Sequence, residues 1–235
     1  IGEGWGLAEG GTGMGAGFAV LSGKEHRSNN EPYVNQLNIA SNGGPASPDS
    51  DGWITYGLPV VGGLMYRESV EIDELKQPME FRFLRLVAGS GGAGRRRGGP
   101  ALEIAYGPLE HSMDVIWPCD ATHYPPKGVR GGKNGINCKH WQVGVDGKEQ
   151  ELPNIVVIRL EKGEFVKGNQ SGGGGYGDPF KREPERVLED ILEGYETLQR
   201  AHDLYGVAFT GSLEQGTLSV DLAGTERLRL QNMGK

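Results

Sequence analysis

Residues 172–179 read GGGGYGDP, four consecutive glycines followed by a tyrosine, a glycine, an aspartate and a proline. The stretch follows a predicted strand and precedes a predicted helix, an arrangement also found in phosphate-binding loops. Because glycine has no side chain, we expect this backbone to pass close to another chain or to a substrate. Gly173, Gly174, Tyr176 and Asp178 are therefore candidate contacts for a substrate or an interface.

The pattern of a nucleotide-binding loop is incomplete in this stretch. Gly172, Gly174 and Gly177 satisfy the bare spacing G-x-G-x-x-G. However, Pro179 disfavours helical geometry at Asp178, so the glycines do not open the helix directly. The chain also lacks the Gly-Lys-Ser/Thr ending of a P-loop, and no acidic residue about 20 positions further on ends a parallel strand. Close backbone packing is the preferred interpretation.

A second glycine loop lies at residues 86–99, which read LVAGSGGAGRRRGG. Consecutive N–H groups in such a loop form an anion-binding nest, and arginine binds carboxylate or phosphate through two hydrogen bonds. On this interpretation Arg95 and Arg97 contact a substrate carboxylate or a nucleotide. The alternative, which we favour, is a tight turn whose arginines pair with acidic neighbours or with a partner subunit.

Composition limits the classes of function. The chain has 235 residues, 41 of them glycine, and a net charge of −7. Neutralising phosphates takes a basic surface, so general nucleic-acid binding is not expected. The hydrophobic content of 36% is low for a domain that folds alone, and we expect a partner to supply part of the apolar surface.

The sequence also indicates where in the cell the protein is expected. No apolar run approaches the roughly 20 residues of a membrane span. The start at Ile1 has no features of a signal peptide and is typical of a chain cut from something longer. We expect a cytoplasmic protein with reduced cysteines.

Hydrophobic periodicity predicts an α+β fold, mostly a short-stranded β-sheet with long glycine-rich loops and a C-terminal helical hairpin. Residues 66–75 are predicted to be strand-like. In the following strand, apolar and charged residues alternate, which places Met79, Phe81 and Phe83 inward. The run 155–158 is apolar on both faces and is predicted to be a central strand. Further candidate strands are residues 17–21, 34–39, 102–106, 113–117, 141–145 and 218–222.

Two helices are predicted near the end of the chain. Residues 184–192 begin with proline and glutamate, and Gly194 closes this helix. Thr197 caps the second helix, which ends at Gly206. The resulting organisation is a loop-rich segment that forms an interface or an access route (1–63), a β-rich domain (64–182), and a C-terminal helical hairpin with a closing strand (183–235).

No complete active site is visible, and the catalytic residues are left unassigned. Cys119 with His123, and Cys138 with His140, could jointly supply four zinc ligands. Their spacing matches no known zinc module, so ordinary loop residues are the preferred interpretation and no metal site is predicted. The chain has no Gly-x-Ser-x-Gly elbow and no Cys/His nucleophile pair.

Together, the two loops and the end of the chain resemble the hydantoinase B family. Residues 90–99 look like that family's S-G-G-A-G-x-x-R-G-G, and residues 172–179 are similar to its G-G-G-G-Y-G-D-P loop. Residues 194–207 resemble its closing segment, which ends in Y-G-V. The resemblance covers roughly residues 50–230. It extends to the C-terminal half of 5-oxoprolinase and to the alpha-type subunit of acetone and acetophenone carboxylases.

The resemblance implies one part of a larger, ATP-dependent hetero-oligomer that is inactive alone. The expected partners are a hydantoinase A-type subunit, which holds ATP, and the N-terminal half of a B-type subunit, which supplies His/Asp metal ligands and is not matched here. ATP and a divalent metal are thus expected in those parts and no cofactor in this chain. The implied reaction is hydrolysis of a cyclic amide such as a hydantoin, a lactam or an oxoproline-like ring. Ketone carboxylation and a non-catalytic scaffold are the alternatives.

Overall fold

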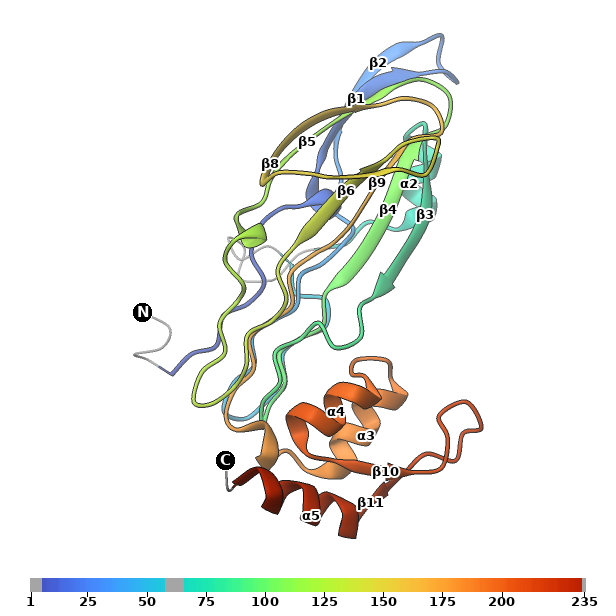
Figure 1. Ribbon diagram of the computed structural model, residues 1–235. Coiled ribbons are helices and arrows are strands. Elements are labelled where there is room, and N and C mark those ends of the chain that lie inside the picture. The colour runs from blue at the N-terminus through green and yellow to red at the C-terminus, as the bar shows by residue number, and fades with distance from the viewer. Residues whose placement is uncertain (1–5, 58–65, 234–235) are drawn as a thin grey trace.

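The computed structural model describes residues 6–57 and 66–233, which form two large antiparallel sheets, a bundle of glycine-rich segments and a helical C-terminal unit with a small two-stranded sheet (Figure 1). The first sheet has the order β2-β1-β5-β8 and the second the order β3-β4-β9-β6-β7. The elements are η1 (Ala16–Phe18), β1 (Val20–Glu25), β2 (Glu31–Gln36), α2 (Val70–Lys76), β3 (Met79–Leu86), β4 (Leu102–Pro108), β5 (Met113–Pro118), η3 (Asp120–Thr122), β6 (Lys139–Val143), β7 (Glu149–Glu151), β8 (Ile155–Leu160), β9 (Phe165–Asn169), η4 (Pro179–Lys181), α3 (Pro184–Leu192), α4 (Leu198–Tyr205), β10 (Ala208–Thr210), β11 (Ser219–Asp221) and α5 (Leu222–Met233).

The main hydrophobic core joins the two large sheets. Leu21 of β1 and Trp117 of β5 contribute from the first sheet, and Ile104 and Tyr106 of β4 from the second. All four side chains are at most 1% exposed. β1 and β2 come from the segment predicted to be loop-rich, so residues 20–36 form part of the β-sheet core region.

Below the sheets, five glycine-rich segments run side by side without forming β-strands (Figure 1). We call them the glycine bundle: residues 9–11, 43–46, 90–99, 126–136 and 172–177. Along residues 172–176 the backbone N–H groups donate to the segments 126–136, 90–99 and 9–11 in turn and then to the first two again, whereas Gly177 donates to the segment 126–136. The acceptors, in order, are the carbonyl oxygens of Ile136, Gly99, Glu9, Lys133, Arg96 and Val129, at 2.8–3.2 Å.

A three-residue period is that of a polyproline II helix, whereas a β-strand alternates with period two. The central segment is thus surrounded on all sides by hydrogen-bonded backbone. A Cβ atom on Gly173 would lie 1.8 Å from the Gly44 carbonyl oxygen, and one on Gly174 would lie 2.1 Å from that of Lys127. The close approach expected of these glycines is confirmed, and the neighbours are other segments of the same chain.

The C-terminal unit, residues 184–233, has a small core of its own. Val187 and Ile191 of α3 pack with Ala201 and Tyr205 of α4. The two predicted helices are confirmed, including the Thr197 hydroxyl that accepts from Arg200 N and the left-handed Gly206 at φ 61°. Gly194, between the two helices, ends α3 with a positive φ of 74°.

Four predictions about strands and helices were wrong or incomplete. Residues 70–76 are helical and not strand-like, because Ser69 Oγ caps the first turn at Ile72 N (3.3 Å) and Glu71 and Asp73 lie there. The closing strand predicted at 218–222 is confirmed as β11, but the tail that follows it, residues 222–233, forms the helix α5, which was not predicted. Its buried face is made by Gly224 and Thr225, so no apolar stripe marks it as a helix. 

The third wrong prediction concerns the run 155–158, which lies at the edge of its sheet as part of β8. Ile155 and Val157 are 67% and 72% exposed on its outer face, and a pattern that is apolar on both faces cannot tell this situation from a central strand. The fourth wrong prediction concerns Phe83, which we expected to point inward from β3. The register of β3 shifts between Phe81 and Phe83, so Leu84 and Leu86 pack against the core in its place. Phe83 instead carries the guanidinium of Arg85 4.5 Å from its ring centroid.

Candidate functional site

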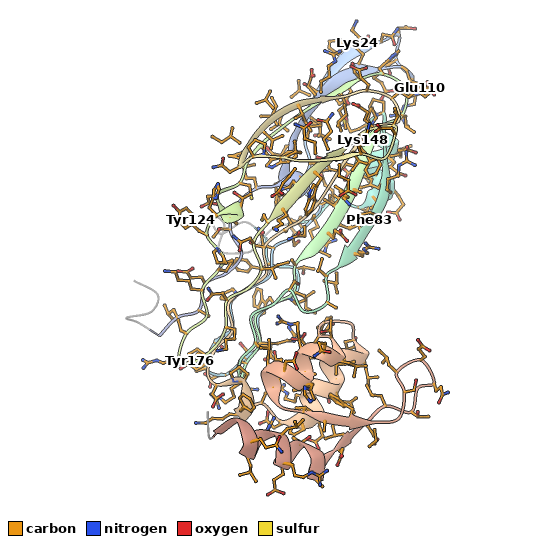
Figure 2. All side chains as sticks on the ribbon, viewed as in Figure 1. Lys24, Phe83, Glu110, Tyr124, Lys148 and Tyr176 are labelled. Atoms are coloured by element: carbon orange, nitrogen blue, oxygen red, sulfur yellow. The ribbon has the colours of Figure 1, made fainter. Side chains whose placement is uncertain are left out.

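The predicted site residues lie together at the end of the glycine bundle that adjoins the C-terminal unit. Figure 2 labels Tyr176 in this region. The Arg96 and Tyr176 backbones pair with each other in both directions, which joins the arginine loop to the GGGGYGDP loop. Sequence reasoning thus selected two loops that are neighbours in space although about 80 residues separate them.

Arg97 points into the protein and forms an ion pair with α3. Its Nε lies 2.7 Å from Asp190 Oδ1, and both side chains are at most 10% exposed. The Tyr195 ring stacks on the same guanidinium, with 4.6 Å between Cζ and the ring centroid. The alternative that the arginines pair with acidic neighbours is therefore confirmed for Arg97, and its guanidinium is buried away from solvent.

A second buried arginine extends this pair into a network. Arg182, 1% exposed, binds Asp190 Oδ2 with Nη2 at 2.8 Å and Nε at 3.0 Å. The same guanidinium holds both carboxylate oxygens of Asp51, at 2.7 and 3.0 Å. We call Arg97, Arg182, Asp51 and Asp190 the arginine network. It connects the segment around residue 51, the arginine loop and α3.

The Asp51 carboxylate of this network stays ionised because its arginine partners outweigh the effect of burial. Burial alone would raise the pKa of Asp51, but hydrogen bonds from Arg182 and the charges of Arg182 and Arg97 lower it below its ordinary value. Buried charges are stable only when paired and hydrogen-bonded in this way. Asp51 and Asp190 were not selected from the sequence, because isolated aspartates carry no spacing signal.

The remaining predicted site residues have local structural contacts. Arg95 Nη2 donates to the Pro48 carbonyl at 2.9 Å, and Asp178 Oδ1 accepts from Phe180 N at 3.0 Å to cap η4. Gly173 and Gly174 lie within the bundle. A substrate or interface contact through Arg95, Tyr176 or Asp178 stays a prediction.

A second cluster of reactive groups is buried where the bundle meets the sheets. Cys119, at the end of β5, and Cys138, just before β6, are free thiols that are at most 1% exposed and lie next to each other. Cys138 Sγ lies 3.7 Å from Gln170 Oε1. We call Cys119, Cys138 and Gln170 the thiol cluster.

His140 lies beside this cluster but is fixed in the neutral form. Its Nε2 accepts the Ala16 N–H at 3.1 Å, and the Trp117 ring packs 5.2 Å away. Burial lowers the pKa of His140 to about 3. A ring that is neutral and already an acceptor serves as a buried structural residue rather than a general base near neutral pH.

Burial of neutral His140 predicts acid-sensitive stability. Between pH 6.5 and about 3 the unfolded chain binds a proton that the folded chain does not, so stability falls as pH falls through this window. Urea unfolding at pH 5 should show a loss of about 2 kcal/mol relative to pH 8 from this group. The variant His140→Gln should flatten the profile, whereas His202→Gln, on an exposed helix position, should keep the wild-type slope. Equal slopes in all three proteins would contradict this assignment.

The two cysteine–histidine pairs considered as zinc ligands, Cys119 with His123 and Cys138 with His140, are not placed to form a zinc site. His140 Nε2 is already a hydrogen-bond acceptor, and His123 is exposed on its loop. In the described ranges 6–57 and 66–233, no group of three or more His, Cys, Asp or Glu side chains is placed to hold a metal ion. The described residues thus do not fit the divalent metal that the family resemblance implies. That the metal and ATP are held by other parts stays a prediction.

A surface groove of about 620 Å³ opens at the far end of the first sheet, near Lys24 and Glu110 (Figure 2). Its lining charges pair locally, as in Lys162 with Glu110 at 2.7 Å and Arg159 with Glu161 at 3.3 Å. None of the predicted site residues lines it. Among the described helices, none has the length and apolar character needed to cross a membrane.

Comparison with known proteins places this architecture in a family. Residues 7–179 match the family described as hydantoinase B/oxoprolinase. Caprolactamase subunit beta of Pseudomonas jessenii is 32% identical over 200 residues, covering 82% of this chain and 34% of that protein. The acetone carboxylase alpha subunit of Xanthobacter autotrophicus is 25% identical over 232 residues, covering 84% of this chain and 30% of that protein.

Solved structures agree with these matches. The ATP-dependent caprolactamase of Pseudomonas jessenii superposes with a TM-score of 0.76 at 27% identity, over 94% of this chain and 38% of that one. The nucleotide-free acetone carboxylase structure, at 22% identity and a TM-score of 0.72, shares the fold. The chain spans about a third of the length of the curated relatives named above. Since the family match and the 32% identical relative both cover most of its residues, the chain belongs to the hydantoinase B/oxoprolinase family.

Proposed function

We propose that this chain is part of a hydantoinase B-type subunit that hydrolyses a cyclic amide at the expense of ATP, together with a hydantoinase A-type partner. The observation that carries the proposal is its similarity in sequence to caprolactamase subunit beta and in fold to the ATP-dependent caprolactamase. A lactam amide is a poor electrophile, and phosphorylating its oxygen would create a leaving group. That step requires a nucleotide-holding partner.

The contribution of this chain to such an enzyme is architectural. The glycine bundle and the arginine network fix the two loops to each other through backbone hydrogen bonds and buried ion pairs. The edge of this rigid part carries Arg95, Tyr176 and Asp178, which we propose as contacts for substrate or for the remaining part of the B-type subunit. Rigid supporting elements hold site residues more precisely than free loops do.

Ketone carboxylation is the second candidate function. It is supported by the similarity to the acetone carboxylase alpha subunit, which is lower in identity but covers 84% of this chain. Both reactions would begin by phosphorylating a carbonyl oxygen. They would differ in the second reactant, which is water in hydrolysis and bicarbonate in carboxylation.

Reconstitution separates these functions. The chain would be co-expressed with the remaining part of a B-type subunit and with an A-type subunit, and ATP consumption would be followed with caprolactam, hydantoin or 5-oxoproline. We expect ring opening that depends on ATP and on all components. Bicarbonate-dependent loss of acetone, without ring opening, would favour the carboxylase. ATP hydrolysis by the purified chain alone would contradict the need for partners.

A further inference from the structure

The thiol cluster holds two cysteines side by side where the glycine bundle meets the sheets. Cys119 and Cys138 are 19 residues apart in sequence, and Cys138 N donates to the Ala121 carbonyl at 3.1 Å, which keeps the two segments together. Both thiols are free, and the consecutive residues Thr12 and Gly13 contact one of them each, Thr12 contacting Cys138 and Gly13 contacting Cys119. Their neighbours include no third His, Cys, Asp or Glu positioned to complete a metal site in the described ranges.

The two thiols have different environments. The adjacent Cys138 side chain is the main factor that lowers the pKa of the Cys119 thiol, and the Ala121 and Gly15 N–H groups act in the same direction. Burial raises the pKa of the Cys138 thiol. A lower pKa makes Cys119 the better nucleophile, while Cys138 retains its proton.

The half-buried residues 12–14 pack directly against the two thiols. A Cβ atom on Gly13 would lie 2.7 Å from Cys119 Sγ, and the carbonyl oxygen of Thr12 lies 4.0 Å from Cys138 Sγ. Gly13 and Gly15 both have positive φ, at 88° and 52°. A small oxidant therefore needs only a local displacement of residues 12–15 to reach Cys119, without opening either sheet.

We propose that Cys119 and Cys138 form a reversible intramolecular disulfide when the protein meets a peroxide. The Cys119 thiolate attacks one peroxide oxygen and the O–O bond breaks, which gives a sulfenic acid and hydroxide; the hydroxide takes up the thiol proton as water. The Cys138 sulfur then attacks Cys119 Sγ, the S–O bond breaks, and the departing hydroxide leaves as water with the Cys138 proton. Two thiols and one hydrogen peroxide thus give one disulfide and two waters, and an external dithiol reverses the reaction.

The disulfide would tie together a loop that holds the glycine bundle. Residues 120–137 lie between the cysteines, and the carbonyls of Lys133 and Ile136 in this loop accept from Gly175 and Gly172. Closing a loop of this length restricts the unfolded chain, so the oxidised protein should resist unfolding more than the reduced one. Oxidation would thereby fix one of the segments that surround the central glycines.

Peptide mapping after peroxide treatment tests the proposal on the folded chain, with or without its partner chains. We expect a loss of two hydrogen atoms per chain, a peptide that links Cys119 to Cys138, and full reversal by dithiothreitol. In the variant Cys138→Ser, a sulfenic-acid reagent such as dimedone should label Cys119. In Cys119→Ser, Cys138 should react at least tenfold more slowly than Cys119 does in Cys138→Ser.

The controls separate a site from incidental oxidation. Circular dichroism before and after treatment confirms that the chain is folded. A linkage that forms only in urea would overturn the proposal, and so would sulfonic acid on either cysteine without a linked peptide. Failure of the folded chain to react at either cysteine would also overturn it, because residues 12–15 would then be impermeable to peroxide. None of these outcomes depends on the proposed enzymatic function.

Discussion

Replacing Gly173 by alanine is expected to prevent stable folding of the chain. The added Cβ would lie 1.8 Å from the Gly44 carbonyl oxygen and 2.5 Å from its carbon, and both atoms belong to backbone that is itself hydrogen-bonded in the bundle. No rotamer change relieves such an overlap, so the segments must separate and the surrounding hydrogen bonds must break. We expect a loss of more than about 4 kcal/mol, beyond the usual range for single substitutions.

The measurement is urea unfolding followed by circular dichroism, or the yield of folded protein where no transition is seen. Gly144→Ala is the matched control, since its new Cβ would meet the flexible Asp146 carboxylate at 3.1 Å and the Lys148 carbonyl oxygen at 3.9 Å, an ordinary contact. Gly144 should tolerate the methyl group with a loss of less than about 1 kcal/mol. A Gly173→Ala protein as stable as Gly144→Ala would show that the central segment has room for side chains, and the bundle as described would be wrong.

The glycine loops show how far the sequence could predict this fold. Four consecutive glycines predict a close backbone approach, because nothing else in their chemistry favours such a run. The identity of the neighbours was not predictable, since hydrogen bonds to segments 9–11, 43–46, 90–99 and 126–136 depend on long-range packing. The low content of apolar residues has the same origin, because part of the interior is filled by backbone in place of side chains.

The secondary structure was predictable where local signals agree. In α4, the Thr197 cap and the left-handed Gly206 mark both ends, and these predictions are confirmed. In α5, the buried positions Gly224 and Thr225 have no hydrophobic signature, so a pattern search has nothing to detect. The bulge that turns Phe83 outward is likewise set by pairing with β4 and not by the residues of β3 themselves.

The candidate site was predicted in position but not in detail. The arginine loop and the GGGGYGDP loop do meet, and Arg97 does pair with an acidic neighbour. Its partner Asp190 lies 93 residues away in sequence. A buried ion pair at that separation leaves no periodicity or spacing in the sequence, so only the three-dimensional fold identifies it.

Removing the charge of Asp190 is expected to have the second large effect. In Asp190→Asn, Arg97 and Arg182 remain buried and lose the carboxylate that both contact at 2.7–3.0 Å. Breaking a buried ion pair on one side costs about 3–5 kcal/mol, because an uncompensated charge stays in the interior. The double variant Arg97→Met/Asp190→Asn should recover part of the loss, since only Asp51 and Arg182 then need to pair. Glu110→Gln, which breaks an exposed ion pair with Lys162, should leave the urea midpoint unchanged.

The pH profile gives this network a second, independent signature. The pKa of Asp51 is lowered below its ordinary value of 3.8 in the folded chain, so its stabilising contribution is present above pH 3.8 and is lost as pH falls through the folded pKa. Asp51→Asn should therefore remove the component of acid unfolding below pH 3.8, while the component from His140 between pH 6.5 and about 3 persists. Urea midpoints measured at half-unit pH steps resolve the two. If Asp51→Asn instead left the profile below pH 3.8 unchanged, Arg182 could not be holding the Asp51 carboxylate ionised. Asp51 would then stabilise the fold by some means other than its charge.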